Sequence, residues 1–228
     1  MPDFPTTRLS LVLAAAEQSN AQSGDAFAAL CRIYWQPLYM FIRRRGYGHE
    51  EAQDLTQSFI TRILEKNVLR QFQRERGRFR SFLLASLKNF LTNEWDASQA
   101  QKRGGGTPPV PISQIELQDD DTPEKIFEKQ WALALLQRVF AQLQDEFRRE
   151  GQSDRFGRLS SCLLGDESSL RYRQVARQLG MSEGAVKVAI HRLRRRFHEM
   201  LREEISMTVA EERDISDEIR YLLSALQT

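Results

Sequence analysis

The sequence predicts an all-α protein of two small helical domains joined by a flexible linker, with a helix-turn-helix in the second domain. Apolar residues recur at spacings of three and four along most of the chain, and no stretch alternates with period two for long enough to make a strand. A segment rich in Gly and Pro interrupts this pattern. The predicted division is an N-terminal helix (1–20), a first domain (21–100), a linker (101–122), a second domain (123–203) and a C-terminal amphipathic extension (204–228).

The charge of the chain is unevenly distributed. The 228 residues are 28% charged and 41% hydrophobic, which suits one or two small globular domains, and the net charge is only +2. Residues 70–103 and 171–202 are nevertheless strongly basic, whereas residues 104–128 and 203–228 are acidic. This arrangement suits a protein that contacts nucleic acid at two places, with acidic segments that face solvent or shield the basic surfaces.

The N-terminal stretch imitates a secretion signal without having its length. Arg8 precedes the apolar run 9–16, but this run is short and Asp3 lies where a signal peptide carries positive charge. We therefore expect a helix that docks on the first domain, a cytoplasmic protein and no membrane insertion, since no apolar run could span a bilayer. Cys31 and Cys162 lie among apolar residues and are expected to be buried free thiols.

Two helices are expected at the start of the first domain. The first begins after Asp25 and reaches about Phe41, and Pro37 should kink or split it. A glycine-containing turn at 43–49 separates it from a helix over residues 50–65. That second helix leaves a set of polar side chains on its outside: Asp54, Gln57, Ser58, Thr61 and Arg62.

Cations and aromatic residues alternate between residues 72 and 82. Arginines in such a pattern can bind phosphates while aromatic faces stack on unpaired bases. The alternative is that Phe79 and Phe82 belong to the core, and we expect this of at least one of them. The helix that follows, residues 81–96, is apolar almost all round and should lie at the centre of its bundle. Its polar side chains fall on one strip: Lys88, Asn89, Asn93 and Asp96.

The second domain is expected to begin directly after the linker. Thr122 and Pro123 suit the cap and first turn of a helix that continues to about Phe147. A short helix over residues 156–163 follows it. The tail, residues 215–226, forms a further amphipathic helix.

Residues 172–191 have the pattern of a helix-turn-helix. Ala176 is small enough for a second helix to cross it closely, Gly180 tolerates the positive φ of a tight turn, and Ser182 can cap the next helix. The second helix then carries a run of His and Arg where the phosphates of a duplex would lie. The alternative is a pair of ordinary amphipathic helices with a solvated arginine face.

Three stretches, in this order, resemble a bacterial RNA polymerase sigma factor of the extracytoplasmic-function type, in a divergent subgroup with a C-terminal extension. Residues 54–66 (DLTQSFITRILEK) look like the helix that binds the clamp of the polymerase largest subunit. Residues 77–95 (GRFRSFLLASLKNFLTNEW) look like the segment that opens and reads the promoter −10 element, and residues 172–197 look like the −35 module. The resemblance implies a protein that binds core RNA polymerase and directs promoter recognition and transcription initiation.

The resemblance assigns the candidate site residues to three groups. The polymerase-binding group is Asp54, Gln57, Ser58 and Thr61. The −10 group is Arg76, Arg78, Phe79, Arg80, Lys88, Asn89 and Asn93. The −35 group is Ser182, Glu183, Lys187, Val188 and His191, which face the bases, with Arg192, Arg194, Arg195 and Arg196 on phosphates.

The chain departs from the family pattern at some points. Ser58 stands where the family has a more acidic run, the linker is long, and residues 204–228 are extra. We expect this tail to dock on the helix-turn-helix domain and restrain it. The expected partners are core RNA polymerase, promoter DNA and an anti-sigma protein or another regulator, and the free protein is expected to be a monomer.

The main alternative is a helix-turn-helix regulator that acts without replacing the sigma subunit and that dimerises through its tail. An enzyme is not expected, because the sequence has no Gly-rich phosphate loop, no nucleophile with a partnered base and no ligand cluster. No cofactor and no metal site are predicted either; the three histidines lack Cys or carboxylate neighbours at ligand spacing.

Overall fold

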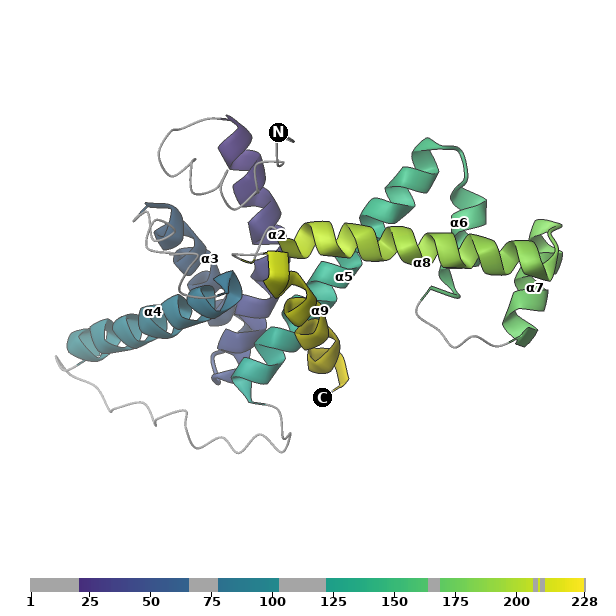
Figure 1. Cartoon of the computed structure of the whole chain (residues 1–228). Coiled ribbons are helices and arrows are strands. Elements are labelled where there is room, and N and C mark those ends of the chain that lie inside the picture. Colours follow the sequence, from purple (N-terminus) through teal and green to yellow (C-terminus); the bar gives the residue numbers. More distant parts are fainter. Residues whose placement is uncertain are drawn as a thin grey trace. The chain divides into compact units, whose positions relative to one another are not determined.

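The described part of the chain consists of helices and the turns between them. In a computed structural model, residues 21–65, 78–102, 122–163, 169–206, 209 and 212–227 are described, and they form eight α-helices and no strand (Figure 1). The predicted all-α class is therefore confirmed for these residues. The expected N-terminal helix (1–20) and nearly all of the expected linker lie outside them.

The chain divides into two units. The first comprises Met1–Ala134 and Ile205–Thr228, and the second comprises Leu135–Glu204. Each unit is described by itself below. The domain boundaries expected from the sequence stay predictions.

Helices α2 (Ala21–Arg44) and α3 (His49–Glu65) begin the first unit. α2 is continuous through Pro37, so the helix is not split there. Buried side chains on both sides of the proline, Tyr34 and Leu38 among them, pack into the core and stabilise both halves of the helix. Gly46, at φ 94°, makes the turn to α3.

Helix α4 (Phe79–Lys102) contacts each of its neighbours in the first unit. The Phe79 ring meets the edge of Tyr34 on α2 at 5.5 Å between centroids, and Phe90 lies 5.5 Å from Phe59 on α3. Lys88 forms an ion pair with Glu124 at 2.7 Å. These contacts agree with the expectation that this helix is central to its bundle, but residues 92–97 are exposed, and the helix is longer than residues 81–96.

The first unit also contains the start of α5 (Pro123–Arg149) and the whole of α9 (Glu212–Gln227). The Lys125 backbone N–H donates to Thr122 Oγ1 at 3.3 Å, which confirms the predicted cap. α9 buries Ile215, Ile219 and Leu222. The tail helix thus belongs to the first unit, where the Tyr221 hydroxyl donates to Glu128 of α5. The expectation that the tail docks on the helix-turn-helix domain and restrains it stays a prediction.

The second unit contains the rest of α5, α6 (Ser153–Ser160), α7 (Ser169–Leu179) and α8 as far as Glu204. The Phe156 ring of α6 lies between Phe140 and Phe147 of α5, at 5.2 and 5.3 Å. These contacts place the short predicted helix around residue 156 in the core of the unit. Cys162 is buried and Cys31 half-buried, and both are free thiols.

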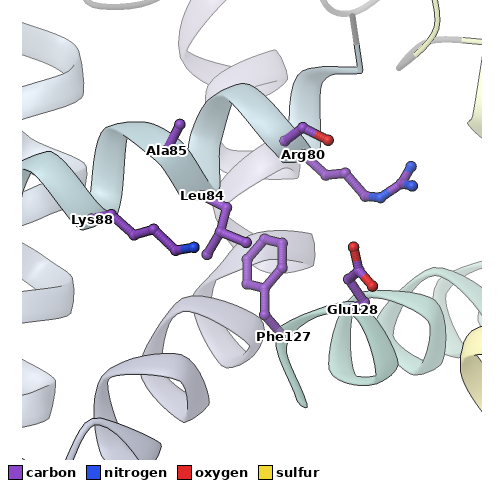
Figure 2. A pocket seen from close by; sticks show the side chains of 7 residues that line it. Arg80, Leu84, Ala85, Lys88, Phe127 and Glu128 are labelled. Carbon is purple, nitrogen blue, oxygen red and sulfur yellow. The ribbon is translucent and has the colours of Figure 1, made fainter. Parts of the chain in front are cut away.

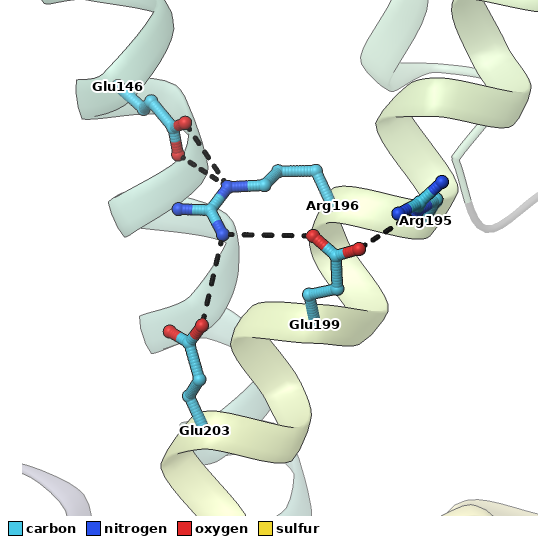
Figure 3. Close-up of polar contacts among 5 residues, drawn as sticks. All are labelled: Glu146, Arg195, Arg196, Glu199 and Glu203. Carbon is cyan, nitrogen blue, oxygen red and sulfur yellow. Dashed lines mark hydrogen bonds and ion pairs between the residues drawn. The ribbon is translucent and has the colours of Figure 1, made fainter. Parts of the chain in front are cut away.

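Helices α5 and α8 (Glu183–Ser206) pair antiparallel in this unit. Arg138 Nε lies 3.0 Å from Glu204 Oε2, and Gln142 Nε2 donates to Glu204 Oε1 at 2.7 Å. Further along, Glu146 accepts from Arg196 Nε at 3.1 Å (Figure 3). The residue numbers rise on α5 as they fall on α8, which gives the antiparallel direction.

A three-residue turn joins α7 to α8. Gly180 has φ 62°, and the Met181 N–H donates to the Ala176 carbonyl at 2.9 Å, which closes the end of α7. Ser182 Oγ accepts from the Ala185 N–H at 3.2 Å at the start of α8. Val186 is fully buried. The positive φ of Gly180 and the cap by Ser182 therefore agree with the geometry that the sequence predicted for this turn.

Candidate nucleic-acid interface

The first half of α8 presents an exposed face after the Gly180 turn. The hydroxyl of Ser182 caps the start of this helix. The next residue, Glu183, forms an ion pair with Arg173 of α7 at 3.2 Å. Lys187 Nζ lies 6.0 Å from the ring centroid of Tyr172. The exposed side chains fall at helical spacing on one face: Ser182, Glu183, Lys187, Val188, His191, Arg192 and Arg195.

Two of the arginines assigned to phosphates are engaged inside the second unit instead. Arg194 Nη2 donates to the Cys162 carbonyl at 3.0 Å. Arg196 lies 3.1 Å from Glu146 and 3.9 Å from both Glu199 and Glu203 (Figure 3). A phosphate would have to displace these acceptors, and in the free protein both arginines connect α8 to its own unit. Their assignment to phosphates stays a prediction.

The arginines that remain exposed on this face are better placed for a phosphate. Arg195 pairs with Glu199 at 2.9 Å, but its side chain is 75% exposed, and such a pair on a helix surface contributes only about 0.3–0.5 kcal/mol. Arg192 is exposed as well. Both can bind an anion at little cost.

The polymerase-binding candidates share one side of α3. Asp54, Gln57, Ser58 and Thr61 are all exposed. The opposite side is buried, and there the Thr56 hydroxyl donates to the Ala52 carbonyl at 2.6 Å, which satisfies its polar atom inside the core.

The −10 candidates that the structure describes lie in three environments: the core, the solvent-facing side of α4, and a cluster with residues of α5 and α9. Arg76 lies outside the described residues. Phe79 is 2% exposed and belongs to the core, as expected of at least one of the two phenylalanines, so it cannot stack on a base while the core is intact. Asn89 and Asn93 are exposed on α4, and Lys88 is half-exposed beside Glu124.

Arg78 and Arg80 lie in a cluster with residues of α5 and α9, which we name the arginine cluster: Arg78, Arg80, Glu128, Trp131, Glu218 and Tyr221. Arg80 is 3% exposed and Glu218 is 1% exposed, and the two form an ion pair. Arg78 Nε lies 2.9 Å from the other carboxylate oxygen, Glu218 Oε2.

Aromatic rings complete the arginine cluster. The Arg80 guanidinium carbon lies 4.2 Å from the Tyr221 ring centroid and 4.9 Å from that of Trp131. Arg78 lies 5.4 Å from the same tyrosine ring, and the Tyr221 hydroxyl donates to Glu128. Burial, together with the charge of Arg78, lowers the pKa of Arg80. Burial and the hydrogen bond to Glu128 raise the pKa of Tyr221.

No family model, curated protein or solved structure matches this chain.

A hollow between α4 and α5 lies beside the arginine cluster. Figure 2 shows Arg80 and Glu128 at one end, with their polar groups toward one another, and Lys88 at the other. Leu84, Ala85 and Phe127 supply apolar surface between them. The hollow thus combines apolar walls with a cation at each end.

The sequence analysis did not identify the acidic and aromatic members of the arginine cluster, which are Glu128, Trp131, Glu218 and Tyr221. A signal was present, because Glu218 falls within the apolar stripe of the tail, with Ile215, Ile219 and Leu222 at helical spacing. A carboxylate in such a stripe indicates a buried cationic partner. Nothing in the sequence pattern specified that the partner is Arg80.

Neither a metal site nor a membrane-spanning helix is found among the described residues. No group of three or more His, Cys, Asp or Glu among them could hold a metal ion. None of their helices is both long enough and apolar enough to cross a membrane.

Proposed function

We propose that this protein is a sigma factor, which binds core RNA polymerase and directs it to promoters. The observation that carries the proposal is the exposed face of α8, with Lys187, Val188, His191 and Arg192 directly after the Gly180 turn. A helix of this kind can enter the major groove with its first turns against base edges.

The side chains of this face suit the reading of a −35 duplex. Lys187 and His191 can donate to guanine or adenine acceptors, and the exposed Val188 can contact a thymine methyl group. Arg192 and Arg195 can bind the flanking phosphates, in the role that the sequence had given to Arg194 and Arg196 as well.

The exposed side of α3 supports the polymerase-binding part of the proposal. Asp54, Gln57, Ser58 and Thr61 form a polar face without a described partner element. This face offers one carboxylate, which can pair with a cation of the polymerase, and three neutral side chains that can form hydrogen bonds.

The exposed side of α4 supports contact with an opened −10 element. Opening a duplex costs about 1.4 kcal/mol per stacked step, so capture of unpaired bases is needed to stabilise the opened state. Asn89 and Asn93 offer amide groups for base edges, and the neighbouring Lys88 offers a cation for the backbone.

Run-off transcription with purified core RNA polymerase on a library of promoter fragments tests the proposal. We expect transcripts that depend on both the protein and a defined promoter subset. Binding to duplex DNA without any association with core polymerase would contradict the proposal and favour the helix-turn-helix regulator, which should also be a dimer.

A further inference from the structure

Helix α9 brings to Arg78 and Arg80 the two kinds of group that a nucleic acid would bring. Glu218 supplies an anion that contacts both guanidinium groups, as a phosphate does. Tyr221 supplies an aromatic face over both, at 5.4 Å from Arg78 and 4.2 Å from Arg80, as a stacked base does.

The buried ion pair of Glu218 with Arg80 would be unusual for a helix that has only a structural role. A buried ion pair is often no more stabilising than apolar residues of the same size, because both charges lose their water. The apolar residues Ile215, Ile219 and Leu222 already anchor α9. The charge of Glu218 therefore adds a specific, exchangeable contact to a helix that has apolar anchors of its own.

We propose that α9 is an intramolecular competitor of single-stranded DNA for Arg78 and Arg80. Glu218 occupies the position of a phosphate and Tyr221 that of a base, so nucleic acid reaches both arginines only after α9 has left them. The inference rests on the proposed function, because it deepens the role of the −10 candidates, but it concerns the free protein and needs no polymerase for its test.

The test compares two substitutions on α9 that each remove one negative charge. Glu218→Gln removes the anion from the arginine cluster and keeps the shape of the side chain. Asp217→Asn is the matched control, since Asp217 is 57% exposed and pairs with Arg220 on its own helix. The affinity of each full-length variant for a labelled single-stranded oligonucleotide is measured by fluorescence anisotropy at several salt concentrations.

We expect Glu218→Gln to bind the oligonucleotide about tenfold more tightly than the unsubstituted protein, with a steeper salt dependence because one or two more phosphates are neutralised. Asp217→Asn should stay within about twofold, which is the size expected of a remote surface charge. Equal affinities of the two variants, or no measurable binding by any of them, would overturn the inference.

A second measurement covers the case in which Glu218→Gln does not fold, which circular dichroism would reveal. Amide hydrogen exchange of residues 212–227 in the unsubstituted protein is followed with and without saturating oligonucleotide. If DNA displaces α9 from the arginines, the backbone amide hydrogens of α9 must exchange faster when the oligonucleotide is bound. Unchanged or slower exchange would show that α9 stays in place and would overturn the inference.

The two proposals fail in different ways. If the unsubstituted protein supports initiation with core polymerase but Glu218→Gln binds DNA no better than Asp217→Asn, only the competition is wrong. If Glu218→Gln alone gains affinity but no variant supports initiation, the competition is supported and the proposed function is wrong.

Discussion

Neighbouring glutamates near the end of α8 show how much the environment of a single carboxylate matters. Glu204 is 5% exposed and accepts from both Arg138 and Gln142, so each of its oxygens has a partner inside the second unit. Glu203 is 69% exposed and lies 3.9 Å from Arg196. The same side chain is thus a structural contact at one position and a solvated charge at the next.

We expect Glu204→Ala to lower the free energy of unfolding by about 3 kcal/mol, because it leaves the 17% exposed Arg138 side chain without its anion. Glu203→Ala should change it by about 0.5 kcal/mol or less. Urea denaturation followed by circular dichroism measures both variants. Equal losses in the two variants would contradict the assigned role of Glu204.

Single residues were predicted from the sequence where a local rule decides them. Gly180 was expected at positive φ, Ser182 and Thr122 were expected as caps, and the structure has all three as expected. The contacts of Arg194 and Arg196 were not predicted, because a run of arginines on a helix does not reveal which of them face a neighbouring helix. Their partners, the Cys162 carbonyl and Glu146, are distant in the sequence.

At the scale of elements, the turn between α7 and α8 offers a test of the backbone alone. Gly180 has φ 62° and no atom within 4 Å of the position that a Cβ would take. Gly180→Ala should therefore cost about 1 kcal/mol through backbone strain, without a clash. Gly184→Ala, inside α8 and in ordinary contact with Ser182, should instead stabilise by about 0.5 kcal/mol.

Thermal unfolding of the two glycine variants, under conditions where the transition is reversible, checks both signs. A Gly180→Ala variant as stable as the unsubstituted protein would mean that the turn adopts another conformation in solution.

Helices were easier to predict than their ends. The apolar periodicity gave each described helix its approximate place, whereas α4 continues beyond the expected residue 96 to Lys102. The residues of this extension, which include Ala and Gln, are good helix formers without an apolar stripe, so propensity continues the helix where periodicity gives no signal. Pro37 shows the opposite case, in which packing overrides a local helix breaker.

At the scale of the whole molecule, the proposed function separates two binding steps. Asp54→Arg, on the exposed side of α3, should weaken binding to core polymerase about tenfold and leave duplex promoter binding unchanged. Lys187→Ala should instead change the preference among −35 sequences and leave polymerase binding unchanged. Asp145→Arg is the charge-reversal control, because this exposed residue belongs to neither candidate face.

Fluorescence-based binding to core polymerase and to duplex promoter fragments measures each variant. If Asp54→Arg and Asp145→Arg reduce polymerase binding equally, the α3 side is not a polymerase contact. The pairing of Glu218 with Arg80 could not be predicted, since the place of Glu218 in an apolar stripe indicates a buried cationic partner but does not say which residue that partner is.

The antiparallel pairing of α5 and α8 carries a mechanical consequence. Two ion pairs, Glu204 with Arg138 and Arg196 with Glu146, connect the helices at different positions along their length. Sliding one helix past the other by a single turn, about 5.4 Å, would break both ion pairs together and place an unpaired charge against apolar neighbours. Within the second unit, the two ion pairs therefore oppose sliding of α5 against α8.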